Sequence, residues 1–144
     1  MTRSEIEALL AEALVGRLGT SIRDEPYVVP ICFLYAKDKI YFHSSPQGKK
    51  LENMKANPLV CFQVDDYNVV PSLRPCDFSV HYKSAIVFGR VRFLRDTKEK
   101  LKALKAMLDK YDISHSAGPI DEAMVDRVAI GEITAEEMSG KKNI

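Results

Sequence analysis

Tryptophan is absent from this chain of 144 residues, and cysteine and histidine occur only three times each. The cysteines, Cys32, Cys61 and Cys76, are odd in number and widely spaced, which argues against a disulfide framework and is typical of a reducing compartment. No apolar run approaches the roughly 20 residues of a membrane-spanning helix, and the charged N-terminus lacks the apolar core of a signal peptide. We therefore expect a cytoplasmic protein that does not bind membranes.

An excess of one charge sign is also lacking. With 21 basic and 20 acidic residues the formal net charge is +1, so we expect no bulk attraction to nucleic acid. Hydrophobic residues make up 46% of the chain and charged residues 28%, a balance that is typical of globular proteins. No internal repeat or shift in composition divides the chain, so we expect one domain over residues 1–144.

Several common site motifs are missing too. The chain contains neither Gly-x-Gly-x-x-Gly nor Gly-x-x-x-x-Gly-Lys, which excludes the usual dinucleotide and nucleoside-triphosphate loops. His43, His81 and His115 have no metal-ligand spacing, so we expect no metal site. Ser44 adjoins His43, but no third residue completes a nucleophilic triad, which argues against a hydrolase.

The residues that are present favour β-structure. Strands are expected near residues 17–22, 27–35, 39–43, 59–65, 78–93 and 126–134. Short turns join most of them, which indicates antiparallel pairing, and closure of the sheet would remove its exposed edges. We expect a mainly β fold, a six-stranded antiparallel barrel with peripheral helices.

Three helices are expected around this sheet. The first is predicted to begin with a capping box of Ser4 and Glu7 and to end at Gly16. The second spans 49–56, and the third spans about 97–111 with a lysine-rich face that is typical of a solvated surface. The lysines of that face are Lys98, Lys100, Lys102, Lys105 and Lys110. Residues 65–76 are expected to form a loop, in which Tyr67 to Val70 could pair briefly.

The stretch from residue 41 to residue 50 carries the densest chemistry. It places two serines, a glycine and the adjacent lysines Lys49 and Lys50 where a strand gives way to a helix. A phosphate dianion requires converging donors and positive charge, and a helix N-terminus adds unpaired N–H groups and the positive end of a dipole. Two interpretations are open at this point, a phosphate-binding turn and a solvated basic turn.

Four segments occur in a distinctive order and spacing: Tyr27-Val28-Val29-Pro30-Ile31, Ile40-Tyr41-Phe42-His43-Ser44, Gly48-Lys49-Lys50-Leu51 and Asn57-Pro58. Together they resemble the pyridoxamine-phosphate-oxidase-like FMN-binding split barrels, and most of all the branch that includes nitroimidazole reductases. The similarity runs from about Leu18 to Leu94, and the closing residues 139–143 are similar to the C-terminal segment of that branch.

The resemblance implies a split β-barrel that binds FMN between the two subunits of a homodimer. It assigns the FMN phosphate to the basic pair, a hydroxyl contact to the serine that follows His43, and a polar flavin contact to the long strand before Gly89. The backbone of the second strand would lie along the flavin. The implied cofactor-binding residues are Val28, Val29, Pro30, Ile31, Phe33, His43, Ser44, Lys49, Lys50 and Ser84.

The activity implied by this branch is that of a flavin-dependent oxidoreductase. NADH or NADPH would reduce the cofactor, which would then reduce a small planar acceptor such as a nitro compound or a quinone. The oxidase proper grips its substrate with C-terminal tryptophan and arginine residues, and this chain has no tryptophan, so pyridoxamine phosphate oxidation is not expected. The alternative function is a module that carries or senses FMN without turnover, and haem handling is a third.

Two side chains near the implied flavin have open roles. His43 is the candidate catalytic residue, and the alternative is a strand-end histidine that only makes a local hydrogen bond. Cys32 could act in redox chemistry, but a free cysteine in a strand is typically a small buried hydrophobic residue, and we expect that role here.

Overall fold

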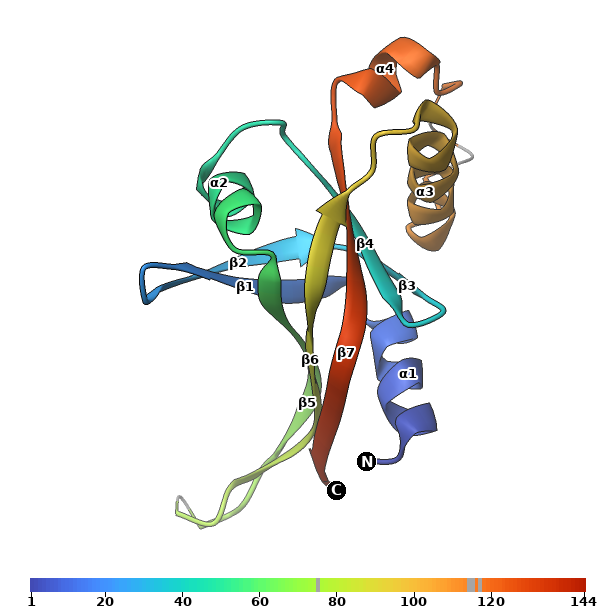
Figure 1. Cartoon of the computed structure of the whole chain (residues 1–144). Coiled ribbons are helices and arrows are strands. Elements are labelled where there is room, and N and C mark those ends of the chain that lie inside the picture. The colour runs from blue at the N-terminus through green and yellow to red at the C-terminus, as the bar shows by residue number, and fades with distance from the viewer. Residues whose placement is uncertain (75, 114–115, 117) are drawn as a thin grey trace.

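Seven strands form one antiparallel sheet in the structure, a computed structural model that describes every residue except 75, 114, 115 and 117 (Figure 1). Their bounds are β1 Val15–Ile22, β2 Glu25–Cys32, β3 Leu34–Ala36, β4 Lys39–Ser44, β5 Leu59–Val70, β6 Ser79–Phe93 and β7 Ala129–Asn143. The order across the sheet is β2-β1-β5-β6-β7-β4-β3. The expected class, a mainly β antiparallel split barrel with peripheral helices, is confirmed. The expected number of six strands is wrong for the described residues.

The extra strand arises because the expected strand over 27–35 is interrupted at Phe33. The backbone N–H of Phe33 donates to the Tyr111 hydroxyl at 2.8 Å, and this hydroxyl can donate to the Leu14 carbonyl at 2.5 Å or to the Phe33 carbonyl at 3.1 Å. Since a side chain and not a neighbouring strand accepts from the Phe33 N–H, the ladder stops there. The chain leaves β2, which pairs with β1, and continues as β3, which pairs with β4. The two ends of the sheet order are therefore not paired with each other, which makes the barrel split.

The core fills the inside of the curled sheet. Phe33 and Phe62 meet edge to face there, with their ring centroids 4.8 Å apart. Two glycines make room for phenyl rings against the strand backbones. A Cβ on Gly131 would lie 2.2 Å from Cζ of Phe42, and a Cβ on Gly16 would lie 2.0 Å from Cζ of Phe62. Both rings are fully buried as a result.

Helix α1, Arg3–Glu12, begins and ends earlier than expected. The hydroxyl of Thr2 accepts from the Glu5 backbone N–H at 3.3 Å, and the Glu5 carboxylate accepts from the Thr2 backbone N–H at 2.7 Å. This pair is the capping box, so the expected box of Ser4 and Glu7 is wrong. The helix stops at its cap Ala13, because Gly16 already belongs to β1.

The β5–β6 hairpin extends well past the rest of the sheet (Figure 1). The loop expected over residues 65–76 is therefore wrong for residues 65–70, which continue β5. Cross-strand pairs such as Tyr67 with Tyr82 and Val69 with Val80 sustain the ladder. Tyr67 and Val69 are 63% and 61% exposed, so this arm presents apolar side chains to solvent.

The C-terminal strand is displaced from its expected position at 126–134. Helix α4, Glu122–Asp126, occupies the start of this range, because the Asp121 carboxylate caps it by accepting from the Met124 N–H at 2.7 Å. Strand β7 follows and runs on to Asn143, lying between β6 and β4. The long reach of β7 brings the chain ends together, and the Met1 amino group donates to the Gly140 carbonyl at 3.2 Å.

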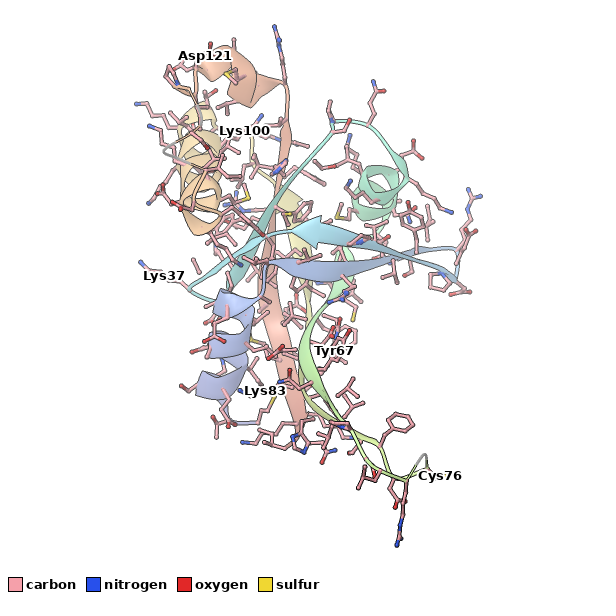
Figure 2. The ribbon with its side chains drawn as sticks, turned by 180° about the vertical axis from the view of Figure 1, so that it is seen from behind. Lys37, Tyr67, Cys76, Lys83, Lys100 and Asp121 are labelled. Carbon is pink, nitrogen blue, oxygen red and sulfur yellow. The ribbon has the colours of Figure 1, made fainter. Side chains whose placement is uncertain are left out.

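Helix α3, Thr97–Lys110, covers one side of the sheet and contributes a small second core of Leu94, Ala103, Met107 and Ile130. The expectation of a fully solvated lysine face is wrong at two positions. Lys100 is 8% exposed, and Figure 2 places it on the side of α3 that faces the sheet. Lys110 is half-buried, with Nζ 3.9 Å from the Phe33 ring centroid and 2.7 Å from the Ala13 carbonyl oxygen. Among the described residues, no helix is long and apolar enough to cross a membrane.

Candidate functional site

The turn from β4 into helix α2, Lys49–Ala56, leaves backbone donors free. Gly48 caps this helix at a φ of +128°, and it supplies no side-chain hydrogen bond to the first turn. The N–H groups of Leu51 and Glu52 donate to the Gly48 carbonyl at 3.0 and 3.1 Å. Within the described chain, the N–H groups of Lys49 and Lys50 have no acceptor. A Cβ on Gly48 would meet nothing within 4 Å, so the space beside this cap is open.

The two lysines of this helix start differ in their surroundings. Lys49 Nζ lies 2.7 Å from the Glu25 carboxylate and 5.0 Å from the Tyr27 ring centroid. The hydrogen bond between Lys49 and Glu25 lowers the pKa of Glu25 and raises the pKa of Lys49. Lys50 is half-buried and has no ion-pair partner in the part of the chain that the structure describes. Glu52 also lies in the first turn, so the formal charges of the two lysines and of Glu25 and Glu52 balance. An anion at the helix start would therefore depend on the free N–H groups and on Lys50, which are unpaired within the described residues.

Buried polar contacts fix α2 on the sheet. Asn53 is 3% exposed, and its side-chain amide donates to the Thr20 hydroxyl at 3.0 Å. Asn57, which ends the helix, donates to the Ser21 carbonyl at 3.1 Å. Asn57 belongs to the Asn57-Pro58 motif identified in the sequence. Asn53 was missed, although an asparagine on the apolar side of a short helix is a usable signal for a buried hydrogen bond.

The residues that end β4 point in opposite directions. Ser44 is 5% exposed, and its hydroxyl donates to the Ser45 carbonyl at 3.0 Å, so its oxygen stabilises the turn and does not face solvent. Ser45 is exposed, and its hydroxyl accepts from the Gln47 N–H at 3.4 Å. His43 is also exposed, and no described residue makes a hydrogen bond with its ring. The local-bonding alternative for His43 therefore has no support from the described residues.

Strand β2 lies at one end of the sheet order and pairs only with β1 among the described strands. Its side chains alternate: Val28 is 62% exposed, Pro30 is exposed, and Ile31 and Phe33 are buried in the core. Val29 is half-buried. A ligand along the free edge of β2 could thus touch Ile31 and Phe33 only through their backbone.

Cys32 continues the outward side of this alternation and is exposed. The expectation that it is a small buried hydrophobic residue is wrong, because the two-residue period of β2 places it on the same face as Pro30. Its redox role stays a hypothesis.

The outer face of β2, β1, β5 and β6 carries a continuous cross-strand row. In the strand register Gly19 is opposite both Val28 and Cys61, and Cys61 is opposite Phe88. Phe88 is 44% exposed, so both ends of the row are apolar and open to solvent. A shallow cavity of about 350 Å³ lies over this face.

Ser84 lies apart from the helix start within one chain. It sits in β6 opposite Asp65, and its hydroxyl accepts from the Gln63 amide at 3.4 Å. No contact among the described residues joins Ser84 to Lys49 or Lys50. The structure therefore brings together the β2 edge, the β4 end and the start of α2, and leaves Ser84 outside this group.

Residues that could hold a metal do not gather in the described part of the chain. No group of three histidine, cysteine, aspartate or glutamate side chains lies close enough there to ligate one ion. His43 and His81 are described, whereas His115 lies outside the described residues. The expectation of no metal site stays a prediction.

Residues 2–142 match the family model described as pyridoxamine 5'-phosphate oxidase. A candidate 5-nitroimidazole antibiotic resistance protein from Bacteroides thetaiotaomicron VPI-5482 is similar in structure, with a TM-score of 0.84 and 28% identity over 96% of this chain and 82% of that one. A FAD-binding protein from Mesorhizobium loti has a TM-score of 0.75 and 29% identity over 100% and 96%. The FAD and haem binding protein from Mycobacterium smegmatis has a TM-score of 0.86 over 99% and 71%, but at 18% identity it shows the fold alone.

Among curated proteins, an uncharacterized protein of Rhizobium meliloti (strain 1021) is 32% identical over 98 residues. The match covers 68% of this chain and 58% of that protein. This chain therefore corresponds to little more than half the length of that relative.

Proposed function

This chain belongs to the pyridoxamine 5'-phosphate oxidase family, and on that premise we propose that it binds FMN and acts as a flavin-dependent reductase of small planar acceptors. The observation that carries the proposal is the open helix start. The N–H groups of Lys49 and Lys50 are free there, the positive end of the α2 dipole lies at the same place, and a phosphate would meet no side chain from Gly48. The ammonium groups of the two lysines would have to turn toward it. The similar protein from Mesorhizobium loti is described as FAD-binding, which favours a flavin as the molecule that carries this phosphate.

FMN is the preferred flavin because the site offers one compact cluster for a terminal phosphate. FAD is the alternative, since the Mesorhizobium loti relative is described as binding it. FAD would need room for an adenosine beyond the helix start, whereas FMN needs none. Mass spectrometry of flavin released from the purified protein decides between the two.

The isoalloxazine ring would lie along the free edge of β2. Val28 and Pro30 present their side chains there, and unpaired backbone groups of the edge strand could meet the polar rim of the ring. Pro30 has no N–H to contribute to the ladder, which suits an edge position. When bound, the flavin supplies the hydride and electron transfer. The residues of this chain would bind and orient it, and His43 is an exposed polar side chain near the end of β4, ahead of the phosphate cluster.

We also propose a homodimer, with the flavin between two subunits. We place Ser84 on the flavin from a second copy, because among the described residues it makes no contact with the helix-start group in its own chain. The apolar row that ends in Val28 and Phe88 gives that copy a surface to bury. Light scattering should give about twice 16.2 kDa for the flavin-loaded protein. A monomer that is fully loaded with flavin would refute this arrangement.

The phosphate assignment is tested with the double variant Lys49→Ala/Lys50→Ala. Loss of two charge-assisted contacts should weaken FMN binding by roughly a hundredfold or more, while riboflavin, which has no phosphate, should bind almost as before. Lys55→Ala is the matched control, because Lys55 is an exposed lysine in the last turn of the same helix. Equal losses for FMN and riboflavin would show that the pair does not hold the phosphate.

The reductase activity is tested with the flavin-loaded protein and a panel of nitroaromatics and quinones. NADH or NADPH should bleach the flavin without oxygen, and an added acceptor should restore its colour. His43→Ala should slow this turnover even when the variant is saturated with FMN if the imidazole acts on the reacting atoms. A loaded protein that oxidises neither donor with any acceptor would favour the alternative of a module that carries or senses FMN.

A further inference from the structure

A second pocket lies between α3 and the β3–β4 hairpin. Its volume is about 480 Å³, which is in the usual range for small-molecule sites. Figure 1 shows α3 and α2 on opposite sides of the sheet, so this pocket is separate from the helix start discussed above. Its apolar wall includes Leu34, Leu94 and Ala106.

Cations dominate the charged groups of the pocket. Lys37, Lys39, Arg92 and Lys102 line it together with the carboxylates of Glu99 and Glu132. Lys37 stands at the tip of the β3–β4 hairpin, where Figure 2 labels it. Neither Lys37 nor Lys102 has an ion-pair partner among the described residues. The lining therefore carries a surplus of two formal positive charges, and two of its lysines are free to meet a ligand.

A buried carboxylate holds the floor of the pocket in place. The Glu132 side chain is 4% exposed and accepts from Lys39 Nζ at 3.0 Å and from Arg92 Nε at 2.7 Å. Burial alone would raise the pKa of Glu132, but Arg92 and Lys39 lower it overall, so the group stays ionised. Burial and the neighbouring Glu132 raise the pKa of Tyr41 to about 12, so its hydroxyl keeps its proton.

Glu132 orients the Arg92 side chain and leaves its terminal N–H groups without an acceptor among the described residues. Its Nε is bound to Glu132, and no described residue accepts from its two terminal nitrogens. An oriented guanidinium with free terminal N–H groups is suited to a planar or tetrahedral oxyanion. The single buried carboxylate neutralises only one of its two cation partners.

We propose that this pocket binds a small organic anion, with a carboxylate or phosphate head near Arg92 and Lys102 and a flat apolar body against Leu34, Leu94 and Ala106. The surplus of positive charge favours an anionic head group, and the apolar wall favours a flat apolar body. This site does not depend on flavin binding, and the proposal stands or falls separately from the function proposed above.

Three ligands with the same ring separate the contributions of head and body. Benzoate and phenyl phosphate carry the two possible heads, and benzyl alcohol carries none. Amide resonances of residues 39–41 and 99–106 should shift as benzoate or phenyl phosphate is added to ¹⁵N-labelled protein, and those of residues 48–52 should not. The anion that binds more tightly identifies the preferred head. Benzyl alcohol should bind at least about tenfold more weakly.

Two variants test the site itself. Lys37→Ala/Lys102→Ala should weaken benzoate binding by about tenfold or more, and Lys98→Ala/Lys105→Ala, with the same change in charge on exposed lysines outside the pocket, should leave it within about twofold. Ala106→Phe should fill the pocket and abolish the shifts. Equal affinity for benzoate and benzyl alcohol, equal losses in the two lysine variants, or no shifts in residues 39–41 and 99–106 would each overturn the proposal.

Discussion

The half-buried Lys110 should make stability depend on pH in an unusual direction. Burial lowers the pKa of Lys110 to about 8 from its ordinary value of 10.5. Below pH 8 both folded and unfolded chains hold the proton, and folding carries the cost of burying the charge. Between pH 8 and 10.5 the unfolded chain binds more protons, so the free energy of unfolding should rise with pH.

The magnitude follows from the same two values. The free energy of unfolding changes by about 1.4 kcal/mol per pH unit where the unfolded chain holds one proton more than the folded chain. Between pH 7 and pH 9.5 the upper limit of the increase is therefore about 2 kcal/mol. Partial exposure of the ammonium reduces this limit to about 1 kcal/mol. The Ala13 carbonyl and the Phe33 ring also reduce the pH effect, because both stabilise the charged form of Lys110 in the folded chain.

The comparison of wild type with Lys110→Met isolates this effect, because methionine keeps the apolar stem without the charge. Urea denaturation at pH 7 and pH 9.5 should show a gain in the wild type, relative to the variant, of about 1 kcal/mol. Titration of groups that do not interact with Lys110 occurs in both proteins and cancels in the difference, whereas the interactions of Lys110 with Cys32 and Tyr111 are part of the measured effect. Identical pH dependence of the two proteins, or a wild type that loses stability relative to the variant as pH rises, would refute the reasoning.

Three further changes test the packing of the core and the contacts and charge of the α2 site. Gly131→Ala should cost about 1–3 kcal/mol of unfolding free energy in a urea titration, because the new Cβ would clash with the Phe42 ring at 2.2 Å, and an unchanged midpoint would contradict this packing. Asn53→Ala should cost about 1–3 kcal/mol by removing the buried donor to Thr20, and a loss of FMN affinity in the folded variant would show that this contact positions the helix start. Glu25→Gln should tighten FMN binding severalfold in a low-salt fluorescence titration, because the carboxylate competes with phosphate for Lys49, and weaker binding would show that Glu25 orients the lysine instead.

The sequence predicted the sheet and the helix start better than it predicted the ends of the elements. Alternating apolar residues identified most strands, and the Gly48-Lys49-Lys50 turn was recognised because its chemistry is local. The interruption at Phe33 could not be predicted, since it depends on the hydroxyl of Tyr111, 78 residues away in sequence. The family motifs gave the correct class, which periodicity alone would not have specified.

Side-chain direction was the other difficulty. Cys32 was expected to be buried because of its residue type, and the structure exposes it. The flavin contact of Ser44, which the resemblance implies, stays a prediction about a buried residue. A shift of one residue along a strand exchanges the inside and outside faces, so a small error in strand phase reverses such assignments. The lysines of α3 show the same limit, because a long apolar stem lets Lys100 lie against the sheet.

The position of β7 between β6 and β4 determines when the barrel can form during synthesis. Among the described strands, the β3–β4 hairpin joins the rest of the sheet only through β7, although about 85 residues separate β4 from β7 along the chain. A nascent chain that has reached β6 can pair β1, β2, β5 and β6, but β6 and β4 still have open edges. These edges remain exposed until residues 129–143 leave the ribosome, so the long-range closure should be the slow folding step. During that interval the chain is most open to strand pairing with a neighbouring copy and to capture by chaperones.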